Sequence, residues 1–208
     1  VNANGTVLGA DQEGATTAFS LAIANINSGL TTTDGHAIQL FLENGIIVGR
    51  YDSNGVGGIT AADNAAFAVA IDATTGVVSV VQYVSLHHGS PDNPVDISEP
   101  VNLGNTINAV VTVTDGDGDV STASTAIGSA VKFLDDGPTA AINLTANSVS
   151  VDESAGVQAN AVPVPLVYAG VANPGTDLPA AQYAQSAAAV VNANGTVLGA
   201  DQEGATTA

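Results

Sequence analysis

The sequence predicts an all-β fold, a sandwich of short antiparallel strands. Apolar and small or polar residues alternate with a period of two in many segments, the pattern of strands with one buried face. The 208 residues include 23 Gly and 8 Pro, which mark frequent turns. With 4 Phe, 4 Tyr and neither Trp nor Met, the core must be filled by Val, Ile, Leu and Ala rather than by large aromatic side chains.

The alternation gives the expected ranges of the strands in the first part of the chain. The first strand contains Phe19, Leu21 and Ile23, which alternate with small residues. Asn44–Gly45 is a strong signal for a two-residue hairpin turn, and Thr74–Thr75–Gly76 predicts a second turn. The further strands that we expect lie near 38–42, 46–51, 67–71, 77–83, 107–113 and 120–127.

A module boundary is expected at Asp135–Asp136–Gly137–Pro138, because Pro after Gly stops a strand and paired carboxylates prefer solvent or a metal. We therefore divide the chain into a β-sandwich module, 1–137, and a linker with the start of the next module, 138–208. After the boundary, the pattern predicts strands over 141–145, 148–151 and 162–168, the last an edge strand with two prolines, and a helix over 179–190.

An identical repeat sets the organisation of the chain. Residues 1–18 recur without change at 191–208, an offset of 190 residues (191 minus 1). Identical copies at a fixed period are the mark of a tandem array, which usually provides length, stiffness or multivalency. Either one period holds two sandwiches, or residues 139–208 fold back or swap to complete the first. We favour two modules per period.

Composition excludes several classes of partner. Twenty Asp and Glu face only two Lys and Arg, which gives a formal net charge of −18. Nucleic acid and anionic membrane surfaces both need basic residues, so neither is an expected partner. No apolar run is long enough to span a bilayer. The natural counter-charge is a hard divalent cation such as Ca²⁺, and the absence of Cys rules out disulfides and thiolate metal sites.

The motif most suited to a metal is Asp115–Gly116–Asp117–Gly118–Asp119, between two predicted strands. Alternate Asp residues separated by Gly can turn their carboxylates toward one centre. It is not an EF-hand loop, because the sixth position is Val120 and the twelfth is Ala126. The alternative interpretation is a solvated acidic turn.

Two further acidic clusters, Asp135–Asp136 and Asp152–Glu153, are either ligands at a module junction or parts of a solvated linker. The chain from Asp119 to Asp135 runs mostly as a strand, so the first motif and the linker should lie at opposite poles of one module. Our hypothesis is that the first motif meets the linker of the preceding module, while Asp135–Asp136 meet the following module.

Several segments together carry a family resemblance: VTVTDGDGDVSTA, FLDDGPTA, SVSVDESAG, LENGIIVGRYD and AFAVAIDATTGVVSVVQYVSLHH. In this order, over nearly the whole chain, they resemble the tandem extender repeats of giant type I-secreted RTX adhesins. The resemblance implies cadherin-like or immunoglobulin-like sandwiches at the bacterial cell surface, monomeric, with neighbouring repeats of the same chain as partners. They would hold a distal adhesive domain away from the cell in adhesion and biofilm formation, with Ca²⁺ at the junctions. The ligands that it implies are Asp115, Asp117, Asp119, Asp135, Asp136, Asp152 and Glu153.

Two other functional classes have weaker support in the sequence. An enzyme is not expected: His87 and His88 are adjacent on a strand and point to opposite faces, so they do not easily share a metal, and no nucleophile has a paired base. A calcium-dependent carbohydrate-binding sandwich is the alternative. Such a site usually offers an exposed aromatic platform, and the scattered tyrosines count against it: Tyr51, Tyr83, Tyr168 and Tyr183.

Overall fold

The computed structural model describes residues 2–3, 5–7, 9–10, 12–89, 100–151, 170–175 and 184–199. The chain divides into two compact units. The first consists of Val1–Pro138 with the chain from Leu198 onward, and the second consists of Thr139–Val197. Each unit is described by itself.

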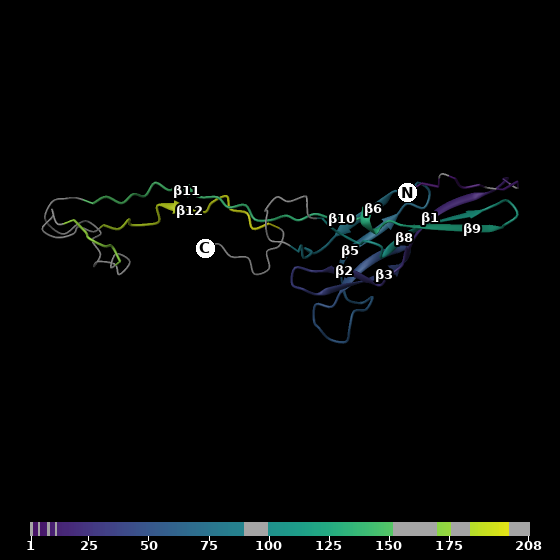
Figure 1. The fold of residues 1–208 in the computed structure, drawn as a ribbon, viewed down its shortest axis with the longest axis horizontal. Coiled ribbons are helices and arrows are strands. Elements are labelled where there is room, and N and C mark those ends of the chain that lie inside the picture. Colours follow the sequence, from purple (N-terminus) through teal and green to yellow (C-terminus); the bar gives the residue numbers. More distant parts are fainter. Residues whose placement is uncertain are drawn as a thin grey trace. The chain divides into compact units, whose positions relative to one another are not determined.

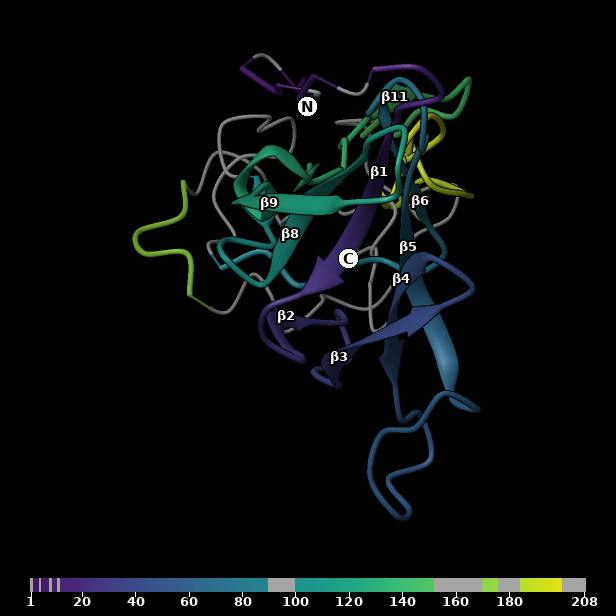
Figure 2. The ribbon, with the colours of Figure 1, turned by 90° about the vertical axis from the view of Figure 1, so that its right-hand side faces the viewer.

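The first unit is built from two antiparallel sheets (Figure 1). In Figure 2, β8 and β9 lie on one side and β4, β5 and β6 on the other. The five-stranded sheet has the order β2 (Asn27–Thr31), β3 (Ala37–Glu43), β4 (Ile46–Tyr51), β5 (Asn64–Ile71), β6 (Val78–Gln82). The three-stranded sheet has the order β1 (Thr16–Ile23), β8 (Ile107–Thr114), β9 (Val120–Ala126). A short pair, β7 (Val101–Asn102) with β10 (Lys132–Phe133), and a 3-10 turn, Gly128–Ala130, complete the unit.

The core lies between these sheets, and this confirms the predicted all-β sandwich. Leu21 and Ile107 from the three-stranded sheet join Ile47 and Phe67 from the five-stranded sheet in one buried cluster. The ring of Phe67 packs against that of Phe133, with centroids 4.9 Å apart. As the composition predicted, the other residues of this buried cluster are aliphatic, because the chain is so poor in aromatic residues.

Both predicted turns form where expected. Asn44 and Gly45 have φ angles of 51° and 82° and lie between the paired residues Glu43 and Ile46. Positive φ at both central residues is the requirement of a type I′ hairpin, which Asn-Gly meets best. The turn after β5 is held by Asp72, whose Oδ1 accepts bonds from the backbone N–H groups of Thr74 and Thr75 at 3.0 and 2.7 Å.

Strand β2 has no alternating hydrophobic pattern and escaped prediction. Its sequence is Asn-Ser-Gly-Leu-Thr, and its register against β3 shifts around Gly29, which has φ of 79°. The buried Ser28 hydroxyl donates to the carbonyl of Ile38 at 2.7 Å and accepts from the N–H of Leu30 at 3.0 Å. Side-chain bonding thus holds the strand where propensity does not.

The second unit contains β11 (Asn143–Leu144) and β12 (Val191–Asn192), which pair antiparallel, and an isolated bridge between Thr139 and Val197. The expected strand over 148–151 is wrong, because those residues are irregular and exposed. The expected helix over 179–190 is wrong in its described part, 184–190, because the carbonyls of Ala189 and Val190 accept bonds from Thr145 instead of from a helical turn. The expected strand 162–168 and residues 179–183 lie outside the described residues.

Candidate metal centre

The turn between β8 and β9 carries the Asp115–Asp119 motif. Thr114, the last residue of β8, pairs with Val120, the first residue of β9. The backbone N–H of Asp115 donates to the carbonyl of Asp119 at 3.0 Å, and the N–H of Asp119 donates to Oδ1 of Asp115 at 2.8 Å. Gly118 has φ of 100°, which a residue with a side chain rarely adopts. The spacing of the motif therefore folds into a tight, internally bonded turn.

This turn brings three carboxylates together, as the sequence predicted. One oxygen each of Asp115, Asp117 and Asp119 lies within 4.8 Å of the others; Asp115 is half-buried and the other two are exposed. A hydrogen bond with the Asp117 side chain, followed by bonds from the backbone N–H groups of Asp119, Gly118 and Asp117, lowers the pKa of Asp115 against the opposing effect of desolvation. These hydrogen bonds within the turn therefore favour the ionised form of Asp115.

The chemistry of these donors fits a hard cation. Ca²⁺ takes six to eight oxygen ligands, whereas Mg²⁺ demands a stricter octahedron and keeps most of its waters. Three carboxylates supply only part of a calcium shell, so water or groups from elsewhere must supply the rest. The exposure of Asp117 and Asp119 leaves the open side of the turn accessible to such groups.

Asp135 and Asp136 lie apart from this turn. They follow β10, which lies at the opposite end of the first unit from the β8–β9 turn (Figure 1). Among the described residues, only those of the β8–β9 turn form a group of three or more acidic or histidine side chains close enough to hold one ion. The expected separation of the two clusters within one module is confirmed, while Asp152 and Glu153 lie outside the described residues.

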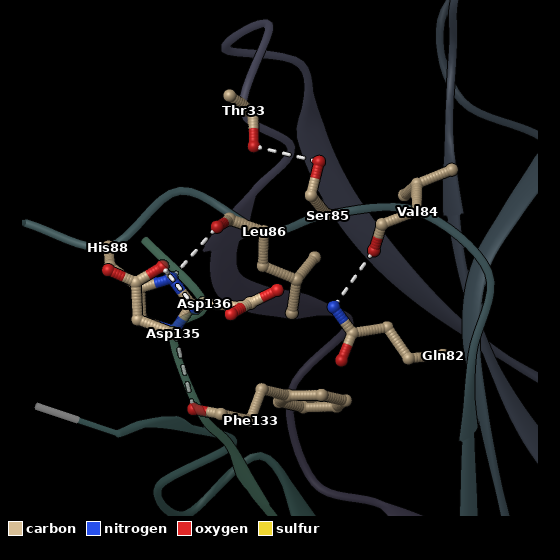
Figure 3. Close-up of polar contacts among 9 residues, drawn as sticks. All are labelled: Thr33, Gln82, Val84, Ser85, Leu86, His88, Phe133, Asp135 and Asp136. Atoms are coloured by element: carbon tan, nitrogen blue, oxygen red, sulfur yellow. Dashed lines mark hydrogen bonds and ion pairs between the residues drawn. The ribbon is translucent and has the colours of Figure 1, made fainter. Parts of the chain in front are cut away.

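Asp135 has a partner that sequence reasoning missed. Nδ1 of His88 lies 3.5 Å from Oδ1 of Asp135 and 2.9 Å from the carbonyl of Leu86, while Nε2 lies 3.3 Å from the carbonyl of Phe133 (Figure 3). Oδ1 of Asp135 also accepts a bond from the N–H of Asp136 at 2.9 Å. The side chain of His88 is 6% exposed. The sequence pattern gives no signal for this contact, because it joins segments that are far apart in the chain.

His87, by contrast, is exposed. Both histidines follow the bridge residue Leu86 and lie outside the strands, so the expectation that they lie on a strand is wrong.

A glycine of the repeated segment lies beside each acidic cluster. A Cβ placed on Gly9 would lie 3.8 Å from Oδ2 of Asp115. A Cβ placed on Gly199, the same residue of the second copy, would contact the backbone oxygens of Asp136 and Gly137. The two glycines have nearly the same positive φ, 80° and 79°.

The structure brings together two of the four tyrosines that the sequence analysis treats as scattered, while Tyr168 and Tyr183 lie outside the described residues. Tyr51 and Tyr83 line one groove of about 580 Å³ on the outer face of the five-stranded sheet, with Glu43, Arg50 and Asn64. They lie on different strands or strand ends and are far apart in sequence, so only the pairing of β4 with β5 and β5 with β6 brings them together. None of the three Asp residues of the β8–β9 turn lines this groove.

A comparison with known protein families gives one match, which lies within the first unit. The profile of a family described as Domain of unknown function (DUF5801) matches residues 2–128, which is more than half of the chain. The chain belongs to the DUF5801 family. The matched DUF5801 region begins in the repeated segment, contains every strand from β1 to β9 and the three-carboxylate turn, and ends before Asp135.

No curated protein and no solved structure shows a significant match to this DUF5801 chain. In the part of the chain that the structure describes, no helix has the length and apolar character needed to cross a membrane.

Proposed function

We propose that this DUF5801 protein is a structural extender segment of a bacterial surface adhesin, with cadherin-like or immunoglobulin-like modules in a tandem array. Calcium at the module junctions stiffens the array, which projects a distal adhesive domain from the cell in adhesion and biofilm formation. The proposal is supported by the identical repeat, by the net charge of −18 and by the carboxylate cluster on a hairpin tip.

The proposed junction is supported by the position of one glycine of the repeated segment, which occurs in the chain as Gly9 and as Gly199. In an array with a period of 190 residues, Gly199 of one module is Gly9 of the next. Asp136 lies beside the first and Asp115 beside the second. The backbone oxygens of Asp136 and Gly137 in one module and the Asp115 carboxylate of the next therefore approach the same short stretch of chain, where oxygens from both could complete the shell of a calcium ion.

The mechanism is electrostatic. Without cations, like charges at the junction repel one another and the modules move independently. A cation held by both modules links them, and its binding free energy adds to the free energy of unfolding. At a hundredfold excess of calcium over Kd, one site adds about 2.7 kcal/mol. That is a large increment for a domain of ordinary marginal stability.

Thermal unfolding and small-angle X-ray scattering of this chain, in calcium and then in chelator, test the proposal. We expect calcium to raise Tm and to give a longer, narrower particle. Magnesium at the same concentration is the control for ionic strength, because it keeps its own waters and demands stricter geometry. The same Tm and the same scattering curve in calcium and in chelator would contradict the proposal.

A second candidate, carbohydrate binding, is favoured by the Tyr51–Tyr83 groove, because an aromatic face beside polar groups suits a sugar ring. The side chain of Tyr83 is exposed, whereas the ring of Tyr51 packs against His36 at 5.9 Å. Binding on a glycan array that Tyr83→Ala abolishes would support this candidate. An array without signal would contradict it.

A further inference from the structure

The five-stranded sheet ends in an apolar strand without charge. β6 pairs with β5 on one side, and no described strand pairs with its other side. Four large apolar side chains in β6 or next to it are exposed: Val77, Val80, Val81 and Tyr83. Residues 73–86 contain no Asp, Glu, Lys, Arg or Pro, although the chain has 20 acidic residues. This edge therefore lacks the charges and prolines that usually keep edge strands apart.

The backbone of β6 presents unpaired groups at this edge. The N–H of Tyr83 donates to the carbonyl of Ala66 at 2.8 Å. In an antiparallel ladder every second pair of residues exchanges backbone bonds, so the bonds to β5 come from Tyr83, Val81 and Ser79. The N–H and C=O groups of the alternate residues, Val78, Val80 and Gln82, point to the free edge.

Both faces of the sheet are apolar at this edge. Val80 pairs with the buried Val69 and therefore lies on the core face, yet it is 47% exposed. Val81 pairs with Ala68 and lies on the opposite face. An added strand would bury apolar side chains on both faces while it bonds to the outward N–H and C=O groups.

The distribution of charge favours a second copy of β6 as that strand. Two chains that each carry a net charge of −18 repel each other, so they approach best where neither face has acidic side chains. β6 meets this condition. The edge strand of the other sheet, β9, is less suited, because it directly follows the three-carboxylate turn and exposes only one large apolar side chain, Val120.

We propose that the β6 strands of two copies of this chain pair antiparallel about a two-fold axis at Val80. In this register Val80 lies opposite Val80 of the other copy, and Val78 lies opposite Gln82. Each outward N–H group then faces an outward carbonyl, and the two five-stranded sheets join into one. This arrangement departs from the monomer that the family resemblance implies.

A tandem array makes this small contact effective. One strand edge buries little area, so a single pair binds weakly. In the array of the proposed function, on which this step alone rests, the same edge recurs every 190 residues. Two arrays from neighbouring cells are then joined by many contacts, and the avidity far exceeds the affinity of one contact. The partner that the inference names for adhesion is thus a second array.

Sedimentation equilibrium of the intact chain in chelator tests the contact. We expect the mass to rise from that of one chain, 20.3 kDa, toward twice that value between about 10 µM and about 1 mM protein. The rise should be smaller at low salt, where repulsion is less screened. Val80→Lys places a charge at the centre of the pairing and should stay monomeric.

Val56→Lys is the matched control, because it adds the same charge at a valine that is 78% exposed in the loop between β4 and β5. It should associate as the parent does. A parent that stays at the mass of one chain at every concentration would overturn the proposal. Equal association of Val80→Lys and Val56→Lys would overturn it as well.

Because the chain has no Cys, the register can be tested with single cysteines. Val80→Cys places the two Cα atoms of the pair about 5.5 Å apart, within the range of a disulfide. In the same register Val77 lies opposite Tyr83, so two Val77→Cys residues lie about 20 Å apart. Under equal mild oxidation, we expect the disulfide-linked dimer to form at least about tenfold faster with Val80→Cys.

Equal rates for Val80→Cys and Val77→Cys would overturn the register and with it the proposal. All of these measurements are made without calcium, so their failure leaves the calcium response of Tm and scattering as it is. A missing calcium response would in turn contradict the proposed function and leave the β6 contact intact.

Discussion

Nδ1 of His88 lies 3.5 Å from Oδ1 of Asp135, and this contact fixes the first carboxylate of the linker to the body of the sandwich. The segment that carries His88 is itself anchored, because Leu86 is buried and bridges to Thr32. Both ring nitrogens of His88 face oxygen atoms, those of Leu86 and Asp135 on one side and that of Phe133 on the other. The linker therefore leaves the module from a defined position.

The first prediction concerns this histidine. His88→Phe keeps a ring of similar size but removes its polar contacts with Leu86, Phe133 and Asp135. We expect a loss of about 1–3 kcal/mol in the free energy of unfolding, because buried acceptors lose their partner. Urea denaturation measures this loss. The neighbouring variant, His87→Phe, is the control and should stay within about 0.5 kcal/mol, since His87 is exposed; equal stability of both variants would contradict the role of His88.

The second prediction concerns packing beneath Phe67. A Cβ on Gly49 would lie 2.5–2.9 Å from three ring carbons of Phe67, which is completely buried. Gly49→Ala should therefore cost about 1–3 kcal/mol of unfolding free energy, with a lower urea midpoint. Gly89→Ala is the matched control, because a Cβ there meets nothing within 4 Å. A Gly49→Ala protein as stable as the parent would show that the ring shifts freely.

The fold could be predicted where local pattern and tertiary contact agree. The strands that match their predicted ranges, such as β3 and β8, have alternating apolar residues that face the core. The Asn44–Gly45 turn has its own conformational preference and needs no tertiary contact. Strand β2 and the irregular 184–190 segment depend on bonds to distant residues, and no local pattern indicates them.

In the candidate site, too, the sequence predicts the contacts that form locally and does not predict those between distant residues. Close spacing of Asp115, Asp117 and Asp119 made their convergence predictable, because a hairpin turn folds them locally. The partnership of His88 with Asp135 joins two segments 47 residues apart (135 minus 88). Tyr51 and Tyr83 line the same groove only because β4, β5 and β6 are neighbours in the sheet. Neither relationship has a signal in the sequence.

The third prediction is a pH dependence. Nε of Arg50 donates to Oε1 of Glu43 at 2.7 Å and Nη2 donates to Oε2 at 2.7 Å. These bonds, and then the charge of Arg50, lower the pKa of Glu43 from its ordinary value of 4.5 against an opposing effect of burial. The pair therefore stabilises the fold above pH 4.5, and its contribution is lost as the pH falls through the lowered pKa of the folded state.

Glu43→Gln should accordingly lower the urea midpoint at pH 7 and should differ less from the parent as the pH falls below 4.5. Midpoints at a series of pH values between 7 and 3 measure this convergence. Glu13→Gln, at an exposed position, is the control and should follow the parent throughout. A constant difference between Glu43→Gln and the parent at every pH would contradict the assignment.

The fourth prediction separates folding from ion binding at the β8–β9 turn. Asp117→Asn removes one charge but keeps an amide that can donate to Asp115, so the Tm in chelator should stay the same or rise as repulsion falls. Its calcium-induced rise in Tm should largely disappear, because a charged ligand is lost. Asp115→Ala also removes the acceptor of the Asp119 N–H bond, so its Tm should fall in chelator as well. Thermal unfolding of both variants, with and without calcium, checks this. A full calcium response in Asp117→Asn would mean that the ion, where it binds, does not use this turn.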